Sequence, residues 1–293
     1  MTERVPDRLP RADLLADAAA LAERALAEDG EGDVTSEVTV PAAQRGEGII
    51  EVRRDTVLAG VAYAEAVAVA CRLGAIEWTA SEGEFLAGGT VAGRVGGLLR
   101  DILRAERVML NVLQRASGIA TATRAYADAV RHTRCRILHT RKTAPGLRLL
   151  DVSAVLAGGG AMHRLDLAHA VMVKDNHWQA LRASGRSLAE ALATARELGV
   201  RGLQVEVETR AQVEEAAAAG ATRLLVDNQT PEMVREWIGL ARSLSPSIEM
   251  EATGGITLAN VATYAEAGAD FVSIGALTHS VTAADLSLEV LDG

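Results

Sequence analysis

Residues 203–228 read LQVEVETRAQVEEAAAAGATRLLVDN, and their pattern contains a strand, a helix and a second strand. Apolar and polar residues alternate over residues 203–207, which is the period of an extended strand. Residues 210–219 suit a helix, and residues 223–226 form a second short strand. Two strands joined through a helix form a βαβ unit, so this stretch predicts parallel strands in one sheet.

The same alternation extends over most of the chain beyond residue 134. We expect six strands, at residues 136–138, 170–173, 203–207, 223–226, 247–250 and 271–274, with helices at 187–198, 210–219, 231–243 and 257–267. Six such units in a row predict an α/β barrel or most of one. A doubly wound sheet is the alternative, and the absence of a GxGxxG or P-loop motif after the first strand weakens it.

The part of the chain before residue 134 has a different pattern and predicts a small α/β unit. We expect an amphipathic helix over residues 11–28, strands at 48–53 and 75–79 and near 90–92, a helix over 61–73, and one or two long helices over 100–131. A domain boundary is therefore predicted near residue 116.

Length and composition exclude several classes of protein. The chain has 293 residues, of which 49% are hydrophobic and 3% aromatic, and this suits two globular domains with many packed helices. Its net charge of −9 argues against a general nucleic-acid surface. Cys71 and Cys135 lie far apart, which argues against a disulfide framework or zinc ribbon. No run of eighteen apolar residues occurs, so we expect a soluble cytoplasmic protein without a membrane partner.

The two lysines stand out because the other basic residues are all arginine. Of 30 basic residues only Lys142 and Lys174 are lysine, and both lie in dense polar clusters, His-Thr-Arg-Lys-Thr and Lys-Asp-Asn-His. A compact ammonium group on a flexible stem is not reproduced by a planar guanidinium. We therefore expect chemistry at both lysines, with two surface lysines left by chance as the alternative.

Reactive residue types follow the predicted strands and indicate the carboxyl-end rim of a barrel. The alternation in residues 203–208 turns Glu206 toward the barrel interior, where a charged group is costly unless it binds something. An internal ion-pair lattice is the alternative. Gly254 and Gly255, directly before a predicted helix, suit a phosphate. With the two lysines as donors and Glu206 and Asp227 as acceptors, the rim could hold a phosphorylated sugar and a divalent ion.

The positive charge around this rim exceeds what one phosphate ester requires. Arg141, His163 and Arg164 are the main candidates, with Arg148 as a further one, and guanidinium groups pair with carboxylates through two hydrogen bonds. The sequence therefore predicts a second substrate with more than one carboxylate. For His163 taken alone, a structural role remains an alternative.

Taken together, the motifs resemble those of the quinolinate phosphoribosyltransferase family, in the same order along nearly the whole chain. The matching segments are 32–36, 107–111, 117–121, 141–146, 158–164, 174–177, 205–208, 225–228, 251–256 and 275–280. The resemblance implies a mixed, sandwich-like α/β N-terminal domain at residues 1–116, to which residues 280–293 return. It also implies an open, incomplete α/β barrel at residues 117–279.

The resemblance also implies an activity, a cofactor and an assembly. The family reaction joins quinolinate to phosphoribosyl pyrophosphate, giving nicotinate mononucleotide, pyrophosphate and carbon dioxide in NAD biosynthesis, and it requires Mg²⁺. A homodimer with shared active sites is implied, and a higher oligomer is left open. No nucleic-acid partner is expected.

The resemblance assigns a role to each candidate site residue. Substrate carboxylates would be held by Arg107 of the partner subunit and by Arg141, His163 and Arg164. Lys142 and Lys174 would lie between the dicarboxylate and the pyrophosphate. Glu206 and Asp227 would bind the ribose hydroxyls and the metal, and the 5′-phosphate would be bound by Thr253, Gly254, Gly255 and Gly275.

Four residues depart from the family pattern, namely His139, Asp151, Asp166 and Trp178. We expect them around the pyridine pocket, which keeps open a paralogue that uses another aromatic carboxylate. Two further alternatives are a non-catalytic anion-binding protein and a barrel enzyme that forms a Schiff base on Lys142 or Lys174. Retention of both Glu206 and Asp227 argues against an anion sensor.

Overall fold

A computed structural model describes residues 9–291, which divide into two compact units. Ala125–Arg141 and Ala161–Gly275 form the barrel unit, and residues 9–124, 142–160 and 276–291 form the N-terminal unit. The predicted domain limits of 1–116 and 117–279 stay predictions. Residues 1–8 belong to the predicted N-terminal domain, and residues 292–293 belong to the predicted returning segment. Both stretches lie outside the described residues.

The barrel unit is built on a six-stranded parallel sheet with strand order β6-β11-β10-β9-β8-β7. The strands are β6 (Arg136–Leu138), β7 (Val171–Val173), β8 (Leu203–Val207), β9 (Arg223–Asp227), β10 (Glu249–Thr253) and β11 (Phe271–Ser273). In the described residues β6 and β7 end the order and do not pair with each other, so the barrel is open, as expected. All six predicted strands are confirmed, with small shifts at their ends.

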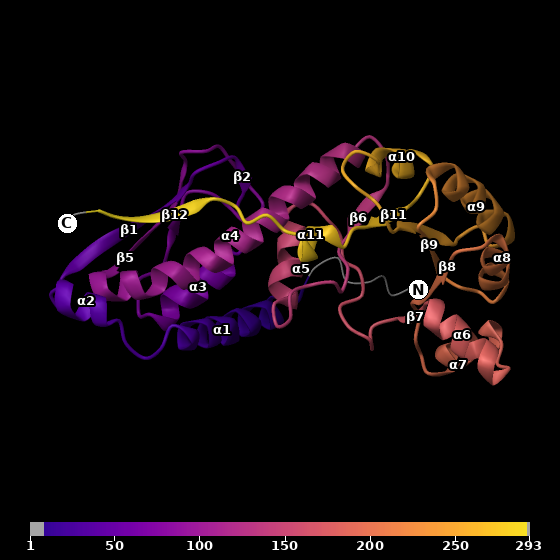
Figure 1. Ribbon diagram of the computed structural model, residues 1–293, viewed down its shortest axis with the longest axis horizontal. Helices are drawn as coiled ribbons and strands as arrows, with labels where there is room; N and C mark the ends of the chain where they lie inside the picture. Colours follow the sequence, from indigo (N-terminus) through magenta and orange to yellow (C-terminus); the bar gives the residue numbers. More distant parts are fainter. Residues whose placement is uncertain (1–8, 292–293) are drawn as a thin grey trace. The chain divides into compact units, whose positions relative to one another are not determined.

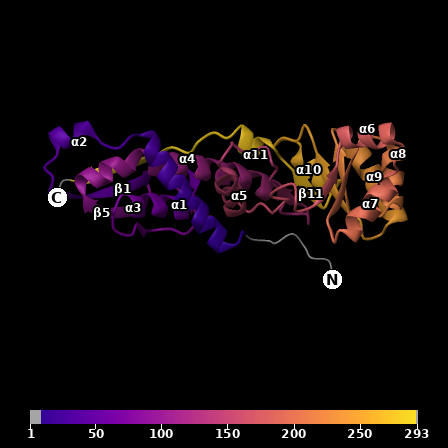
Figure 2. The same ribbon diagram turned by 90° about the horizontal axis from the view of Figure 1, so that it is seen from below.

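Helices cover this sheet between successive strands, as βαβ connections require. They are α6 (Asp175–Ser184), α7 (Leu188–Glu197), α8 (Arg210–Ala218), α9 (Pro231–Leu244) and α10 (Val261–Glu266). Two of these helices begin with a capping box, formed by Ser187 and Glu190 in α7 and by Thr209 and Gln212 in α8. In Figure 1 α8 and α9 lie side by side beyond β8 and β9, and in Figure 2 α6 and α7 lie beside them.

The N-terminal unit contains a mainly antiparallel sheet with strand order β12-β1-β5-β3. Its strands are β1 (Arg45–Val52), β3 (Glu77–Trp78), β5 (Val91–Leu98) and β12 (Leu286–Leu291), and β2 (Thr56–Val57) pairs separately with β4 (Phe85–Leu86). Its helices are α1 (Arg11–Glu28), α2 (Val34–Thr39), α3 (Val61–Ala70), α5 (Arg148–Ala157) and α11 (Ala276–His279). The C-terminal strand β12 thus pairs with β1, from the other end of the chain (Figure 1).

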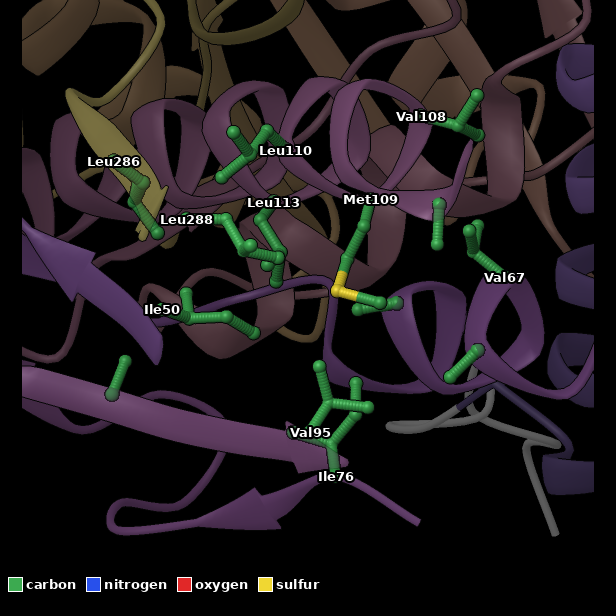
Figure 3. Packing of buried hydrophobic residues seen from close by; sticks show 14 of the residues in the cluster. Ile50, Val67, Ile76, Val95, Val108, Met109, Leu110, Leu113, Leu286 and Leu288 are labelled. Atoms are coloured by element: carbon green, nitrogen blue, oxygen red, sulfur yellow. The ribbon is translucent and has the colours of Figure 1, made fainter. Parts of the chain in front are cut away.

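A single long helix, α4 (Leu99–Val130), fills the region where one or two were expected. Its apolar residues pack on the sheet of the N-terminal unit: Met109 and Leu113 are fully buried, and Leu113 points toward Ile50 (Figure 3). Burying an aliphatic side chain of this size contributes about 2 kcal/mol, so this face of α4 stabilises the unit.

The observed architecture confirms the predicted fold class, a mixed α/β N-terminal unit and an open α/β barrel. Among residues 9–291, no helix combines the length and apolar character that crossing a membrane requires.

Candidate active site

Lys174 and Glu206 form an ion pair at the carboxyl ends of β7 and β8. Lys174 directly follows β7, and its Nζ lies 2.5 Å from Glu206 Oε2. Backbone bonds fix both residues: Lys174 N–H donates to His177 Nδ1 at 3.0 Å, and Trp178 Nε1 donates to the Glu206 carbonyl at 2.9 Å. Glu206 is buried, whereas Lys174 remains half-exposed, so the ammonium group is accessible to a ligand.

Asp227 ends the neighbouring strand β9 and is the second acidic group of this rim. Asn228 donates to Asp227 Oδ2 at 2.7 Å, and Asn228 N–H donates to the Thr253 carbonyl at 2.9 Å. Burial and the negative charge of Glu206 raise the pKa of Asp227 above its usual value. A carboxylate whose charged form is disfavoured by burial and by a neighbouring negative charge favours a cation beside it.

Gly254 and Gly255 follow β10 in a turn and do not directly precede a helix. The expectation of a helix from residue 257 was wrong, because α10 begins at Val261. Gly254 and Gly255 have φ values of 82° and 61°, and Asn260 Oδ1 accepts from Thr257 N–H at 2.7 Å, which holds residues 257–260 in a turn. A side chain at Gly254 would collide with Asp227 and Asn228, so glycine lets this turn approach the β9 end.

Arg141 and Arg164 supply concentrated positive charge in the same unit. Arg164 is buried, and its Nη1 donates to the Ala170 carbonyl at 3.1 Å. Burial and the positive charge of Arg141 lower the pKa of Arg164. Arg141 Nε is buried, and no hydrogen-bond partner for it lies in the described part of the chain. Two guanidinium groups that repel each other in this way form a site for an anion.

A buried row of charged groups lies behind Arg164. His163 Nε2 lies 3.2 Å from Glu251 Oε2, and Arg223 Nη1 lies 3.3 Å from the same oxygen. Burial alone would raise the pKa of Glu251, but the hydrogen bond with His163 and the positive charge of Arg223 lower it to about 2. Glu251 is therefore a carboxylate at neutral pH, with His163 on one side and the charge of Arg223 on the other.

Lys142 is held by a separate network within the N-terminal unit. Its carbonyl accepts from Thr278 Oγ1 at 2.9 Å. Two residues further along, Ala144 N–H donates to Asp151 Oδ2 at 3.1 Å, and Arg115 donates to both Asp151 oxygens at 2.8 Å. Asp151 is fully buried, so this network fixes the backbone on the C-terminal side of Lys142, whose side chain is exposed.

Two predicted ligand positions lie away from these networks. Arg107 is exposed on α4, with its guanidinium 3.7 Å from Glu106, and a role in a partner's site stays a prediction. Gly275 is half-buried just after β11, where the neighbouring Ile274 N–H donates to the Leu138 carbonyl at 3.2 Å. The structure therefore brings together Lys174, Glu206 and Asp227 at neighbouring strand ends, and Arg141 with Arg164.

Comparisons with known proteins match most of the chain. A family model described as quinolinate phosphoribosyl transferase, N-terminal domain, matches residues 33–117, and the corresponding C-terminal domain matches residues 119–289. This chain belongs to the quinolinate phosphoribosyltransferase family.

Three relatives of the chain are named nicotinate-nucleotide pyrophosphorylase. A chloroplastic nicotinate-nucleotide pyrophosphorylase (carboxylating) of Oryza sativa is 40% identical over 91% of this chain and 76% of its own length. A probable enzyme of that name from Bacillus subtilis is 41% identical over 71% of each chain. The solved nicotinate-nucleotide pyrophosphorylase of Francisella tularensis has a TM-score of 0.88 at 30% identity and covers 97% of this chain and 98% of its own.

The four departures from the family pattern were expected around a pyridine pocket, but their side chains are used inside the protein. His139 and Trp178 are buried and bond to backbone groups, and Asp151 pairs with Arg115. Asp166 is exposed and accepts from Ala168 N–H and His169 N–H of its own loop at 2.9 Å. These contacts give each of the four residues a partner within the protein, and their place around a pyridine pocket stays a prediction.

Sequence reasoning gave no role to Arg223 or Arg115, and it counted Glu251 only as a polar residue near a strand end. Arg223 opens the apolar strand β9 and pairs in register with Glu249 of β10. An arginine at the start of a buried strand is a weak signal for an internal ion pair. Its partners could be identified only once β9 and β10 were known to be adjacent.

Proposed function

We propose that this chain transfers the phosphoribosyl group of phosphoribosyl pyrophosphate to quinolinate, giving nicotinate mononucleotide, pyrophosphate and carbon dioxide in NAD biosynthesis. The observation that carries this proposal is the pair of partly buried Arg141 and buried Arg164, in the same unit as the acidic rim of Glu206 and Asp227. The two arginines suit a dicarboxylate, and the two acidic residues suit a ribose with a metal-bound pyrophosphate. The names of the relatives, quinolinate phosphoribosyltransferase (decarboxylating) and nicotinate-nucleotide pyrophosphorylase (carboxylating), support this reaction.

The acceptor end is proposed to bind both carboxylates of quinolinate. Burying the charge of Arg164 close to the positive charge of Arg141 is expensive, so a ligand with one carboxylate would compensate the two guanidinium groups only in part. Arg141 and Arg164 therefore favour quinolinate over nicotinate. The internal use of His139, Asp151 and Trp178 supports this choice, because none of the three offers a new contact to a different ring.

The donor end is proposed to hold phosphoribosyl pyrophosphate with Mg²⁺. Mg²⁺ is commonly bound through one or two carboxylates together with substrate phosphates, and Glu206 and Asp227 fit that donor set. No cluster of three or more metal-binding side chains occurs among residues 9–291, which agrees with a metal that arrives with its substrate. When bound, Mg²⁺ would neutralise charge on the departing pyrophosphate.

The residues of the chain then act mainly by position and charge. The ring nitrogen of quinolinate attacks the anomeric carbon while pyrophosphate leaves, and Lys174 offers a half-exposed ammonium group to that departing charge. Glu206 holds Lys174 in place and, with Asp227, orients the ribose hydroxyls. The alkylated ring nitrogen is positively charged, so it stabilises the electron pair that the departing carbon dioxide leaves on the neighbouring ring carbon, and this carbon then takes up a proton from solvent water. The turn of Thr253, Gly254 and Gly255, with Gly275, is proposed for the 5′-phosphate.

We further propose a homodimer in which Arg107 of each subunit completes the other's site, and a cytoplasmic location. Arg107 is exposed and has only a loose ion pair with its neighbour Glu106, so it is accessible to a second chain. Both cysteines, Cys71 and Cys135, are buried free thiols, which fits a reducing compartment.

A stoichiometric assay tests the proposed reaction. Purified protein with Mg²⁺ and phosphoribosyl pyrophosphate is given quinolinate or nicotinate, and pyrophosphate and carbon dioxide are both measured. With quinolinate we expect the two products in equal amounts, and with nicotinate much less pyrophosphate. Pyrophosphate release from nicotinate that equals or exceeds that from quinolinate would show that the acceptor has been misidentified.

A further inference from the structure

Both ring nitrogens of His163 are occupied by the protein itself. Nδ1 accepts a hydrogen bond from the backbone N–H of Arg164 at 2.8 Å, and Nε2 lies 3.2 Å from Glu251 Oε2. A nitrogen that accepts a hydrogen bond carries no proton, so the proton of this ring is on Nε2, where it faces the carboxylate. The ring therefore has no nitrogen left for a substrate.

A second imidazole holds the preceding backbone group. His163 N–H donates to His139 Nε2 at 2.9 Å, and His139 Nδ1 lies 3.3 Å from the Thr140 carbonyl. Burial lowers the pKa of His139 to about 4, so its ring is neutral and Nε2 can accept at neutral pH. His163 and Arg164 lie in a loop outside any strand, and their buried N–H groups need acceptors that a sheet would otherwise supply. The two imidazoles supply them.

The far side of the His163 ring is anchored to three adjacent strands. Glu251 of β10 also receives Arg223 Nη1 at 3.3 Å, and Arg223 of β9 donates to Glu249 at 2.8 Å. The Arg223 guanidinium lies 4.0 Å from the ring centre of Phe271 on β11. The orientation of the His163 ring is thus set by the sheet, and the ring in turn fixes the N–H of Arg164.

We propose that His163 is a positioning residue, which acts through the backbone N–H of Arg164 to set the Arg164 guanidinium and does not itself bind the substrate carboxylate. The inference rests on the proposed function, in which Arg164 binds a carboxylate of quinolinate. It replaces the ligand role expected for His163 with an indirect one. Nδ1 is the essential atom of the ring, and Nε2 serves to orient it.

Two substitutions separate the roles of the two nitrogens. In His163→Asn the amide oxygen can take the place of Nδ1 and accept from Arg164 N–H, whereas in His163→Gln the amide extends toward the place of Nε2. Loss of one hydrogen bond to a buried donor changes an equilibrium by about tenfold or more. We expect the KM for quinolinate to rise about tenfold or more in His163→Gln and clearly less in His163→Asn. The KM for phosphoribosyl pyrophosphate should change little in either variant.

His169, in the same loop, provides a matched control. We expect His169→Asn and His169→Gln to resemble each other in the KM for quinolinate, so that a difference seen only at position 163 reports on Nδ1. Circular dichroism establishes that each variant is folded. A His163→Gln protein that binds quinolinate as well as His163→Asn, or better, would overturn the proposal.

A spectroscopic measurement tests the inference independently of turnover. Nitrogen NMR of protein labelled at histidine, with the His163 signals identified by their loss in His163→Asn, reports which ring nitrogen carries the proton. We expect a neutral ring protonated on Nε2, before and after quinolinate is added. A doubly protonated ring, or one protonated on Nδ1, would overturn the inference even in a folded, active enzyme. Failure of the wild-type protein to use quinolinate would instead contradict the proposed function.

Discussion

Replacing His139 with glutamine should make the stability of the barrel unit less sensitive to acid. His139 is 1% exposed, and burial lowers its pKa from 6.5 to about 4. In the unfolded chain this ring takes up a proton near pH 6.5, whereas in the folded protein it does so only near pH 4. The unfolded state therefore binds more protons between these values, and stability is lost as the pH falls through that window.

The magnitude follows from the size of the shift. The change in the pKa of His139 from 6.5 to about 4 corresponds to about 3 kcal/mol of unfolding free energy in total, since one pKa unit is worth about 1.4 kcal/mol. The linkage relation predicts a loss of about 2 kcal/mol between pH 7 and pH 5 from this one ring. Glutamine can reach the same positions, because its oxygen can accept from His163 N–H and it has no proton to gain in this range.

Urea unfolding at several pH values measures the effect. Two of the three tryptophans, Trp178 and Trp237, are buried in the barrel unit, and replacing Trp78 of the N-terminal unit with phenylalanine in both proteins restricts the fluorescence signal to the barrel unit. Other titrating groups contribute alike to wild type and His139→Gln, so the difference between their pH profiles isolates His139. His132→Gln, at an exposed histidine beside Glu266, should keep the wild-type profile. Parallel profiles for wild type and His139→Gln would refute the reasoning.

Three further predictions concern activity. Lys174→Arg should lose most turnover although the charge is kept, because a guanidinium cannot reproduce the compact contact with Glu206, and a near-normal kcat would contradict this. Asp227→Asn should raise the KM for phosphoribosyl pyrophosphate more than that for quinolinate, and excess chelator should abolish the activity of wild type; full activity with chelator would exclude a metal requirement. In a dimer with shared sites, inactive Arg107→Ala and Lys174→Ala proteins should recover about a quarter of wild-type activity when mixed in equal amounts. Subunit exchange is shown by tag pull-down, and no recovery after proven exchange would place Arg107 outside the partner's site.

Strand and helix positions in the barrel unit were predictable because their signals are local. The run Leu224-Leu225-Val226 reads as a buried strand in any context, and Thr209 with Gln212 caps its helix through contacts three residues apart. The helix start at Val261 was missed because positive φ values at Gly254 and Gly255 and the bonds of Asn260 keep that segment in a turn. Periodicity alone does not report such turns.

The candidate site was predictable in its residue types but not in its contacts. Lys174, Glu206 and Asp227 follow successive parallel strands, and the carboxyl ends of parallel strands meet at one edge, so their proximity follows from topology. The unusual residues His139 and Asp151 were expected near a ligand, yet each bonds to partners distant in sequence. A residue's type does not reveal whether its polar atoms face a ligand or another part of the protein.

By itself the sequence determined the fold class, the family and the charged residues at the strand ends, because these depend on periodicity and on ordered motifs along the chain. Only the tertiary structure decided that His163 is enclosed between Glu251 and the Arg164 backbone, and that Asp151 holds the segment after Lys142. These roles depend on hydrogen bonds between residues far apart in the chain. A hydrogen bond requires a short distance and a favourable angle between donor and acceptor, and for residues far apart in the chain only the folded structure brings these about.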